Sequence, residues 1–326
     1  MLTLAFVFQS LANRKPELDA GVYAYAKAGF GDYMGFSSAW GYWISAWIGN
    51  VSYFVLLFST LGYFVPMFGE GNTLPAVIGA SLVLWGVHFL VLRGIREAAF
   101  VNLVTTIAKI VPLILFIVIT AVAFRLEVFT ADFWGRGNIE LGGVMQQVRS
   151  MMLVTVWVFI GIEGASNFSA RAERRSDVGR ATVIGFCSVL ALLVLVNVLS
   201  MGIMSQAELA GLKNPSMAGV LEQVVGRWGA VLISVGLVVS LAGALLSWTL
   251  LCAEILFAAA RDHTMPQFLR KENAKHVPVN ALWLATGLIQ LFLIITLFNA
   301  STYLSLLYLA TSMILVPYFW SAAYGL

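Results

Sequence analysis

The sequence predicts an all-α polytopic membrane protein. Hydrophobic residues make up 60% of the 326-residue chain and charged residues only 11%, with a mean hydropathy of +0.89. Soluble domains carry about 25% charged residues. The apolar residues come in long runs, near the roughly 20 residues that a helix needs to cross a bilayer, and the basic residues gather in every second loop between the runs. This composition excludes a soluble enzyme, a nucleic-acid-binding module and a disordered protein.

Eight apolar runs predict the membrane spans, which are residues 36–66, 75–92, 99–124, 150–170, 181–204, 228–258, 280–298 and 302–324. The first range is too long for one crossing. Its early part, residues 31–41, is rich in glycine, and we predict that it bends or lies at the membrane interface.

Residues 1–12 form a shorter apolar segment that Arg14 and Lys15 follow. A signal peptide has its basic residues before the apolar core rather than after it. The segment is also shorter than the roughly 20 residues of a full crossing. We therefore interpret it as the second half of a membrane helix that begins upstream, and the chain as a fragment of a longer protein.

Lysine and arginine residues are distributed unevenly among the loops. Of the 19, 13 lie in four alternate loops and only 5 in the loops between them. The richer loops are residues 13–35, 93–98, 171–180 and 259–279. The positive-inside rule assigns these four loops to the cytoplasmic side. Because one span added or omitted would destroy the alternation, the charges support the number of spans independently of hydropathy.

Ionisable residues inside the predicted spans are few. They are Lys109, Glu163 and Glu254, with His88 as a fourth candidate. A charged side chain in mid-membrane costs about 2.5–3.5 kcal/mol on insertion scales, so each is a candidate for function. The alternative is a charge near the end of a span that reaches the interface, and this reading stays open for Lys109 and Glu254.

Glu163 has the most unusual surroundings, because Gly161 and Gly164 flank it within an apolar run. Glycine disfavours a helix interior by about 1 kcal/mol relative to alanine, so the pair predicts that the helix breaks there. Broken helices occur at membrane depth where they line a cavity, and transporters bind substrates and ions at such breaks. The alternative is a kinked helix with a buried, protonated glutamate that bonds a neighbouring backbone group.

Two tryptophans, Trp157 and Trp248, lie in mid-span near polar residues, where an indole face can attract a desolvated cation by roughly 2 kcal/mol. Asn50 either bonds a neighbouring helix or contacts a substrate, and for an asparagine in a membrane the helix contact is the commoner role. Cys187 and Cys252 lie in apolar runs and predict neither a disulfide nor a metal site.

Three stretches resemble a known family, and together they span the chain. They are Pro16-Glu-Leu-Asp-Ala-Gly21 with Tyr23-Ala-Tyr25, Phe159-Ile-Gly-Ile-Glu163, and Ala258-Ala-Ala-Arg-Asp-His-Thr-Met-Pro266 with Phe268, Leu269 and Asn273. The chain resembles the amino acid–polyamine–organocation transporters and, within them, the basic amino acid antiporters, most closely the arginine–ornithine exchangers.

The resemblance implies a LeuT-like inverted-repeat fold with discontinuous helices. Members have about twelve helices, ten of which form two inverted repeats. Residues 1–326 are then a single transmembrane transporter domain, from about the second half of the second helix to the tenth. The first helix and the last two helices would be absent from this chain.

The resemblance also implies roles for individual residues. Trp157 matches an aromatic residue that lies over the substrate side chain, and Trp248 matches one that contacts its aliphatic part. Lys109 matches a lysine that replaces a sodium ion in some relatives, and Ala46 departs from a more polar residue in others. The implied substrate-binding residues are Trp157, Ile160, Trp248, Asn50, Ser45 and Ala46; the gating or coupling residues are Glu163, Tyr42 and Lys109; the break lies at Gly161 and Gly164.

The implied activity is exchange of cationic amino acids, arginine for ornithine, across the bacterial cytoplasmic membrane by alternating access. The alternatives are an exchanger of another basic amino acid, such as lysine, or of a polyamine, and a truncated membrane fragment that transports nothing. An enzyme is not expected, because the sequence has no nucleophile–base pair or phosphate loop. No cofactor, metal or nucleic acid is expected; the partners are the small-molecule substrate and the lipid bilayer, and a homodimer is left open.

Overall fold

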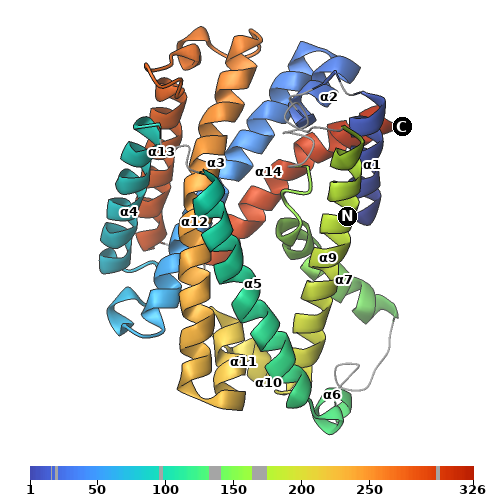
Figure 1. The fold of residues 1–326 in the computed structure, drawn as a ribbon, viewed down its shortest axis with the longest axis vertical. Helices are drawn as coiled ribbons and strands as arrows, with labels where there is room; N and C mark the ends of the chain where they lie inside the picture. Colours follow the sequence, from blue (N-terminus) through green and yellow to red (C-terminus); the bar gives the residue numbers. More distant parts are fainter. Residues whose placement is uncertain (16, 19–20, 95–97, 132–140, 164–174, 299–301) are drawn as a thin grey trace.

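The computed structural model describes residues 1–326 except 16, 19–20, 95–97, 132–140, 164–174 and 299–301 (Figure 1). The elements in chain order are α1 (Leu2–Arg14), α2 (Gly21–Phe30), α3 (Asp32–Gly62), η1 (Pro66–Phe68), α4 (Leu74–Leu92), α5 (Ala98–Val122), α6 (Leu126–Ala131), α7 (Leu141–Val158), α9 (Arg175–Met201), α10 (Gln206–Gly211), α11 (Ser216–Val225), α12 (Arg227–Arg261), η3 (Gln267–Arg270), α13 (Val279–Ile295), η4 (Thr296–Phe298) and α14 (Thr302–Gly325). The all-α prediction is confirmed: across these described ranges the β-type pairing is one isolated bridge between Glu272 and Pro278.

Seven helices of the described residues are long and apolar enough to cross a membrane. They are Asp32–Gly62, Leu74–Leu92, Leu103–Val122, Gly179–Met201, Arg227–Arg261, Val279–Phe298 and Tyr303–Gly325. Each overlaps one predicted span, so a polytopic membrane protein is confirmed. The remaining predicted span, residues 150–170, runs from α7 into residues outside the described part.

The predicted bend at residues 31–41 is wrong, because α3 is continuous from Asp32 to Gly62. Within residues 31–41, all of which the structure describes, only Gly31 has a positive φ, of +87°, and it lies before the helix. The helical glycines instead permit close contact: a Cβ added at Gly41 would lie 2.8 Å from the carbonyl oxygen of Met313 on α14. Small residues of this kind let membrane helices approach closely, and glycine content alone does not distinguish this use from a bend.

The predicted loop at residues 125–149 is also partly wrong. It contains α6, and α7 already begins at Leu141. Residues 143–150, in the first turns of α7, are exposed and include several polar side chains. A prediction from hydropathy finds only the apolar part of a helix, so it misses turns that extend beyond the apolar region.

Two helix starts follow from local side-chain chemistry. Thr73 caps α4, because its Oγ1 accepts from the backbone N–H of Ala76 at 3.4 Å. Ser205 and Glu208 form a reciprocal capping box at α10, with the Ser205 N–H donating to Glu208 Oε2 at 2.8 Å. Such caps satisfy backbone donors that the first turn leaves unpaired.

The long helix α3 lies at the centre of the molecule, where it crosses α14 and packs along α12 (Figure 1). Most of its side chains are buried, including Trp43, Ile48 and Phe54. On one side α4 packs against α13, and on the other α5 packs against α12 and α9. The contact between α5 and α12 is close: a Cβ at Gly236 would lie 2.7 Å from the carbonyl oxygen of Ala108.

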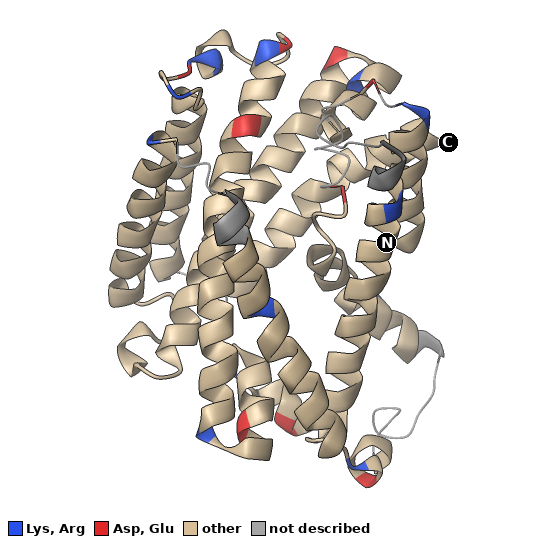
Figure 2. Ribbon diagram, in the orientation of Figure 1, with Lys and Arg blue, Asp and Glu red and all other residues tan. Residues whose placement is uncertain are grey.

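Figure 2 shows the basic residues mainly at the end of the bundle that carries α2, η3 and the end of α12. Arg261 ends α12, and Arg270 ends η3. By the positive-inside rule this end faces the cytoplasm. The opposite end carries α10 and α11, which occupy the predicted external loop 205–227.

Candidate functional site

The helix α7 ends at Val158, and residues 159–163 continue as turns. Gly161 has a φ of +107°, in the left-handed region that favours glycine. A Cβ added there would meet nothing within 4 Å, so the backbone conformation alone accounts for this glycine. The helix therefore ends just before Gly161 and gives way to turns over residues 159–163, the interrupted segment, while Gly164, the second glycine of the predicted break, lies outside the described residues.

A small cavity lies beside this interruption, between α3, α12 and the end of α7. Its lining residues are Ser45, Ala46, Gly49, Tyr53, Trp157, Ile160 and Trp248. Five of these seven are residues that the sequence singled out as substrate-binding. Gly49 and Tyr53 were missed, although Gly49 lies four residues after Ser45 and Tyr53 four residues after Gly49, which puts all three on the same helix face.

The volume of this cavity is about 20 Å³. A single water needs about 10–15 Å³ by the same measure, so the cavity has room for water but not for an amino acid. Trp157, Ile160 and Trp248 are half-buried, whereas Ser45 and Ala46 are each 3% exposed. The walls must therefore move apart before an amino acid can enter between the two indole rings.

Asn50 does not line this cavity. It is fully buried between α3 and α12, where its Nδ2 donates to Cys252 Sγ at 3.9 Å. In the part of the chain that the structure describes, its Oδ1 has no hydrogen-bond partner. The sequence left open whether Asn50 bonds a neighbouring helix or contacts a substrate. The observed geometry is that of a contact between helices.

Glu163 is fully buried and binds side chains from two other elements. Its Oε1 accepts from the Tyr42 hydroxyl at 2.7 Å, and its Oε2 accepts from the Tyr318 hydroxyl at 2.6 Å. The backbone N–H of Gly161 also donates to Oε2, at 3.1 Å. The carboxyl group thus joins α3, α14 and the interrupted segment. Tyr318 was missed, because nothing in the apolar sequence of α14 distinguishes it from an interfacial tyrosine.

Lys109 lies apart from this cavity. It is exposed on α5 and lines a second cavity of about 280 Å³, whose walls also come from α11, α12 and the start of α14. The two other ionisable residues within spans also lie elsewhere. His88 lies on α4, with its Nδ1 2.9 Å from Thr286 Oγ1 on α13, and Glu254 is half-buried on α12.

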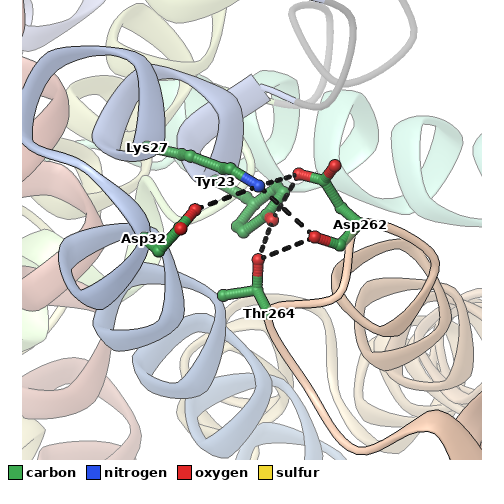
Figure 3. Close-up of polar contacts among 5 residues, drawn as sticks. All are labelled: Tyr23, Lys27, Asp32, Asp262 and Thr264. Atoms are coloured by element: carbon green, nitrogen blue, oxygen red, sulfur yellow. Dashed lines mark hydrogen bonds and ion pairs between the residues drawn. The ribbon is translucent and has the colours of Figure 1, made fainter.

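A polar cluster joins α2 to the cytoplasmic end of α12 (Figure 3). Lys27 Nζ lies 2.6 Å from Asp262 Oδ2 and 3.2 Å from Asp32 Oδ1. The Tyr23 hydroxyl donates to Asp262 Oδ2 at 2.7 Å and lies 2.6 Å from Thr264 Oγ1. Tyr23 and residues 258–266 belong to the stretches that carry the family resemblance, but sequence alone did not predict that they meet.

The cluster perturbs the acidity of its members. The hydrogen bond with Asp262 raises the pKa of the Lys27 ammonium. Hydrogen bonds from Lys27 and then from Tyr23 lower the pKa of the Asp262 carboxyl. Burial raises the pKa of the Tyr23 hydroxyl. The opposite directions for Lys27 and Asp262 are those of an ion pair in which each charge stabilises the other.

Neither cysteine is in a disulfide; Cys187 is exposed and Cys252 is buried. Among the described residues no group of three or more His, Cys, Asp or Glu side chains could hold a metal ion.

Comparison with known proteins identifies the family. The sequence model of the family described as "Amino acid permease" matches residues 1–326. The chain is 73% identical to the arginine/ornithine antiporter of Pseudomonas aeruginosa, over 100% of this chain and 69% of that protein. It is 51% identical to the L-lysine transport protein of Corynebacterium glutamicum, over 99% of this chain and 65% of that protein.

An arginine/agmatine antiporter of Chlamydia caviae is 44% identical, over 99% of this chain and 68% of that protein. The chain therefore spans about two thirds of the length of these relatives. With the family model matched from end to end and seven helices able to cross a membrane, the chain belongs to the amino acid permease family of multi-pass membrane proteins.

Proposed function

We propose that this protein exchanges cationic amino acids across the bacterial cytoplasmic membrane, arginine for ornithine, by alternating access. The 73% identity to a protein named arginine/ornithine antiporter supports the choice of substrates. The observation that carries the proposal is that Trp157 and Trp248 share one cavity at the end of α7.

The chemistry of this cavity suits a cation. Indole faces attract a desolvated cation by about 2 kcal/mol. The end of α7 contributes as well, because the C-terminus of a helix carries about half a negative charge. Among the described residues the cavity lining holds no carboxylate, so we propose that binding rests on weak interactions that permit release. We assign substrate contact to Trp157, Trp248, Ile160, Ser45 and Ala46.

The role of Glu163 in this proposal is to couple the site to helix movement. Its hydrogen bonds to Tyr42 and Tyr318 tie the interrupted segment to α3 and α14. A rearrangement of the segment must break or carry these bonds, so we propose Glu163 and Tyr42 as gating residues. The family resemblance also proposes Asn50 for substrate binding and Lys109 for coupling. Both lie outside the cavity lining in this conformation, in which Asn50 contacts Cys252 on α12.

Counterflow tests the proposal directly. The full-length protein is reconstituted in liposomes loaded with ornithine, and uptake of labelled arginine is compared with uptake into empty liposomes. We expect exchange with internal ornithine, and a reduction of roughly tenfold or more in Trp157→Ala. Trp228→Ala is the matched control, since Trp228 is 56% exposed at the start of α12. Equal uptake into loaded and empty liposomes contradicts the activity, and wild-type exchange by Trp157→Ala contradicts the role of that residue.

A second candidate is exchange of another basic amino acid or of a polyamine. The similarity to a lysine transport protein and to an arginine/agmatine antiporter favours it. Unlabelled lysine, agmatine and putrescine, added outside with labelled arginine, distinguish the two candidates. If any of them competes better than ornithine, the substrate pair is revised while the site assignment stands.

A further inference from the structure

Trp157 is the last residue but one of α7. Beyond Val158 the α-helical hydrogen bonds give way to turns, in which Phe159 N–H donates to Val156 O and Ile160 N–H donates to Trp157 O, each at 3.1 Å. These bonds fix the backbone but leave the side-chain rotamer to its surroundings. The position of its indole ring must therefore depend on the side chains and helices around it. These contacts come from α3 and α14.

Three residues in the described part of the chain contact the indole ring of Trp157. Gly49 lies against its edge, because a Cβ added at Gly49 would be 3.2 Å from Trp157 Cη2 and 3.6 Å from Cζ3. The ring of Tyr53 packs beside it, with ring centroids 5.9 Å apart and planes inclined at 58°. The Trp157 side chain also interacts with the hydroxyl of Tyr303 on α14.

Gly49 is costly for a helix interior, where glycine is about 1 kcal/mol less favourable than alanine. The close contact with Trp157 explains why a glycine stands at this position in spite of that cost. A methyl group at 3.2 Å is tighter than most carbon contacts, so either the indole or α3 must shift by a few tenths of an ångström. The indole cannot retreat freely, because the ring of Tyr53 packs beside it and the hydroxyl of Tyr303 interacts with it.

We propose that Gly49 and Tyr303 are positioning residues that fix the indole of Trp157 and thereby set the relative preference of the site for guanidinium over ammonium side chains. This inference rests on the proposed function. A guanidinium is planar and stacks on an aromatic face, so it depends on the position of the ring plane. An ammonium is a compact, strongly hydrated charge and tolerates a displaced ring better.

The test measures half-saturating concentrations of arginine and ornithine separately, by counterflow with the full-length protein. We expect Gly49→Ala and Tyr303→Phe each to raise the arginine value relative to the ornithine value by about fivefold, the effect of about 1 kcal/mol in a cation–π contact. The maximal rates for the two substrates should change by a common factor. A purely structural defect would lower the maximal rates and leave the ratio of the two concentrations unchanged.

Two variants serve as matched controls. Gly287→Ala, on α13, adds a Cβ where nothing lies within 4 Å. Tyr308→Phe removes a hydroxyl from a residue that is 38% exposed on the same helix as Tyr303. Both should keep the wild-type ratio. An unchanged ratio in both Gly49→Ala and Tyr303→Phe overturns the inference, and if Gly49→Ala does not fold, Tyr303→Phe decides it alone.

A double-mutant cycle asks whether both residues act through the indole. Phenylalanine at position 157 lacks Cη2, Cζ3 and the N–H. In a Trp157→Phe background, the further substitutions Gly49→Ala and Tyr303→Phe should therefore leave the arginine-to-ornithine ratio unchanged. Full additivity overturns the inference. Its failure differs from failure of the proposed function, in which the wild-type protein itself shows no exchange of arginine for ornithine.

Discussion

Lys27 Nζ lies 2.6 Å from Asp262 Oδ2, although the two residues are 235 positions apart. The pair joins α2 to the end of α12 at the cytoplasmic end of the bundle (Figure 3). Tyr23 donates to the same carboxylate oxygen at 2.7 Å, so two donors from one short helix converge on Asp262. A carboxylate held by several donors is restrained more than a carboxylate in a single surface pair.

We expect Asp262→Asn to destabilise the protein by about 1 kcal/mol, a figure kept low because the side chain of Asp262 is 52% exposed and solvent screens the pair. In a protein of this size that corresponds to roughly 2 °C in thermal melting. The matched control is Glu17→Gln, which removes an exposed pair with Lys15 at 4.0 Å and should cause no measurable change. Equal effects of the two substitutions would contradict a special role for the cluster.

The same pair predicts how this contribution depends on pH. The pKa of Asp262 is lowered from its ordinary 3.8, so its contribution is present above pH 3.8 and is lost as pH falls through the depressed pKa. The pKa of Lys27 is raised from its ordinary 10.5, so its contribution is lost only as pH rises above 10.5. The difference in melting temperature between wild type and Asp262→Asn should therefore be constant from about pH 5 to 9. A change within this window would implicate another titrating group.

The buried carboxyl of Glu163 leads to a third prediction. Tyr318→Phe removes the donor at 2.6 Å from Oε2 and leaves a fully buried group with one partner fewer. Removing a hydrogen-bond partner from a buried polar group costs about 1–3 kcal/mol, so the free energy of unfolding measured in denaturant should fall by about that amount. Tyr308→Phe, at an exposed position on the same helix, is the control and should leave the midpoint unchanged. If both variants unfold like wild type, the hydrogen bond from Tyr318 contributes little to stability.

The membrane helices could be predicted from the sequence because their signal is local and strong. A run of some 20 apolar residues has few alternatives to a spanning helix. The glycines on either side of Glu163 predicted a helix break; α7 ends at Val158 and turns follow to residue 163, but Gly164 lies outside the described residues, so the break itself stays a prediction. Prediction was poorer where one residue type has two uses: Gly35 and Gly41 permit close helix contacts in an unbroken α3, although the same content predicted a bend.

Two residues of the small cavity, Trp157 and Trp248, were singled out by their mid-span positions near polar residues, whereas Ile160, Ser45 and Ala46 came from the family resemblance alone. Composition could not have selected Trp157 and Trp248 among ten tryptophans. Contacts between distant segments were beyond reach, as shown by Tyr318 with Glu163 and Lys27 with Asp262. Such pairs depend on how helices pack, and a single sequence carries no direct record of that packing.

Gly161→Ala should destabilise the interrupted segment through the backbone alone. The φ of +107° is unfavourable for alanine, by about 1–2 kcal/mol, while a Cβ there meets nothing within 4 Å. Gly86→Ala on α4 also adds a Cβ into open space, but in a helical conformation, so it should be neutral or stabilising. Unfolding in denaturant compares the two variants. Wild-type stability of Gly161→Ala would mean that the segment can adopt another conformation at little cost.

Exchange of arginine for ornithine should be insensitive to membrane potential. Both substrates carry one net positive charge near neutral pH, so a one-for-one exchange moves no net charge across the membrane. Moving one charge across a potential of 100 mV changes the free energy by about 2.3 kcal/mol. An electroneutral cycle moves no net charge, so the potential adds no driving force to it. Initial rates of arginine uptake into ornithine-loaded liposomes should be equal with and without a potassium diffusion potential. Agmatine lacks the carboxylate and carries two positive charges, so agmatine-loaded liposomes provide the electrogenic comparison. A rate with ornithine that depends on potential would exclude one-for-one exchange of these two cations and would favour the polyamine alternative or coupling to a further ion.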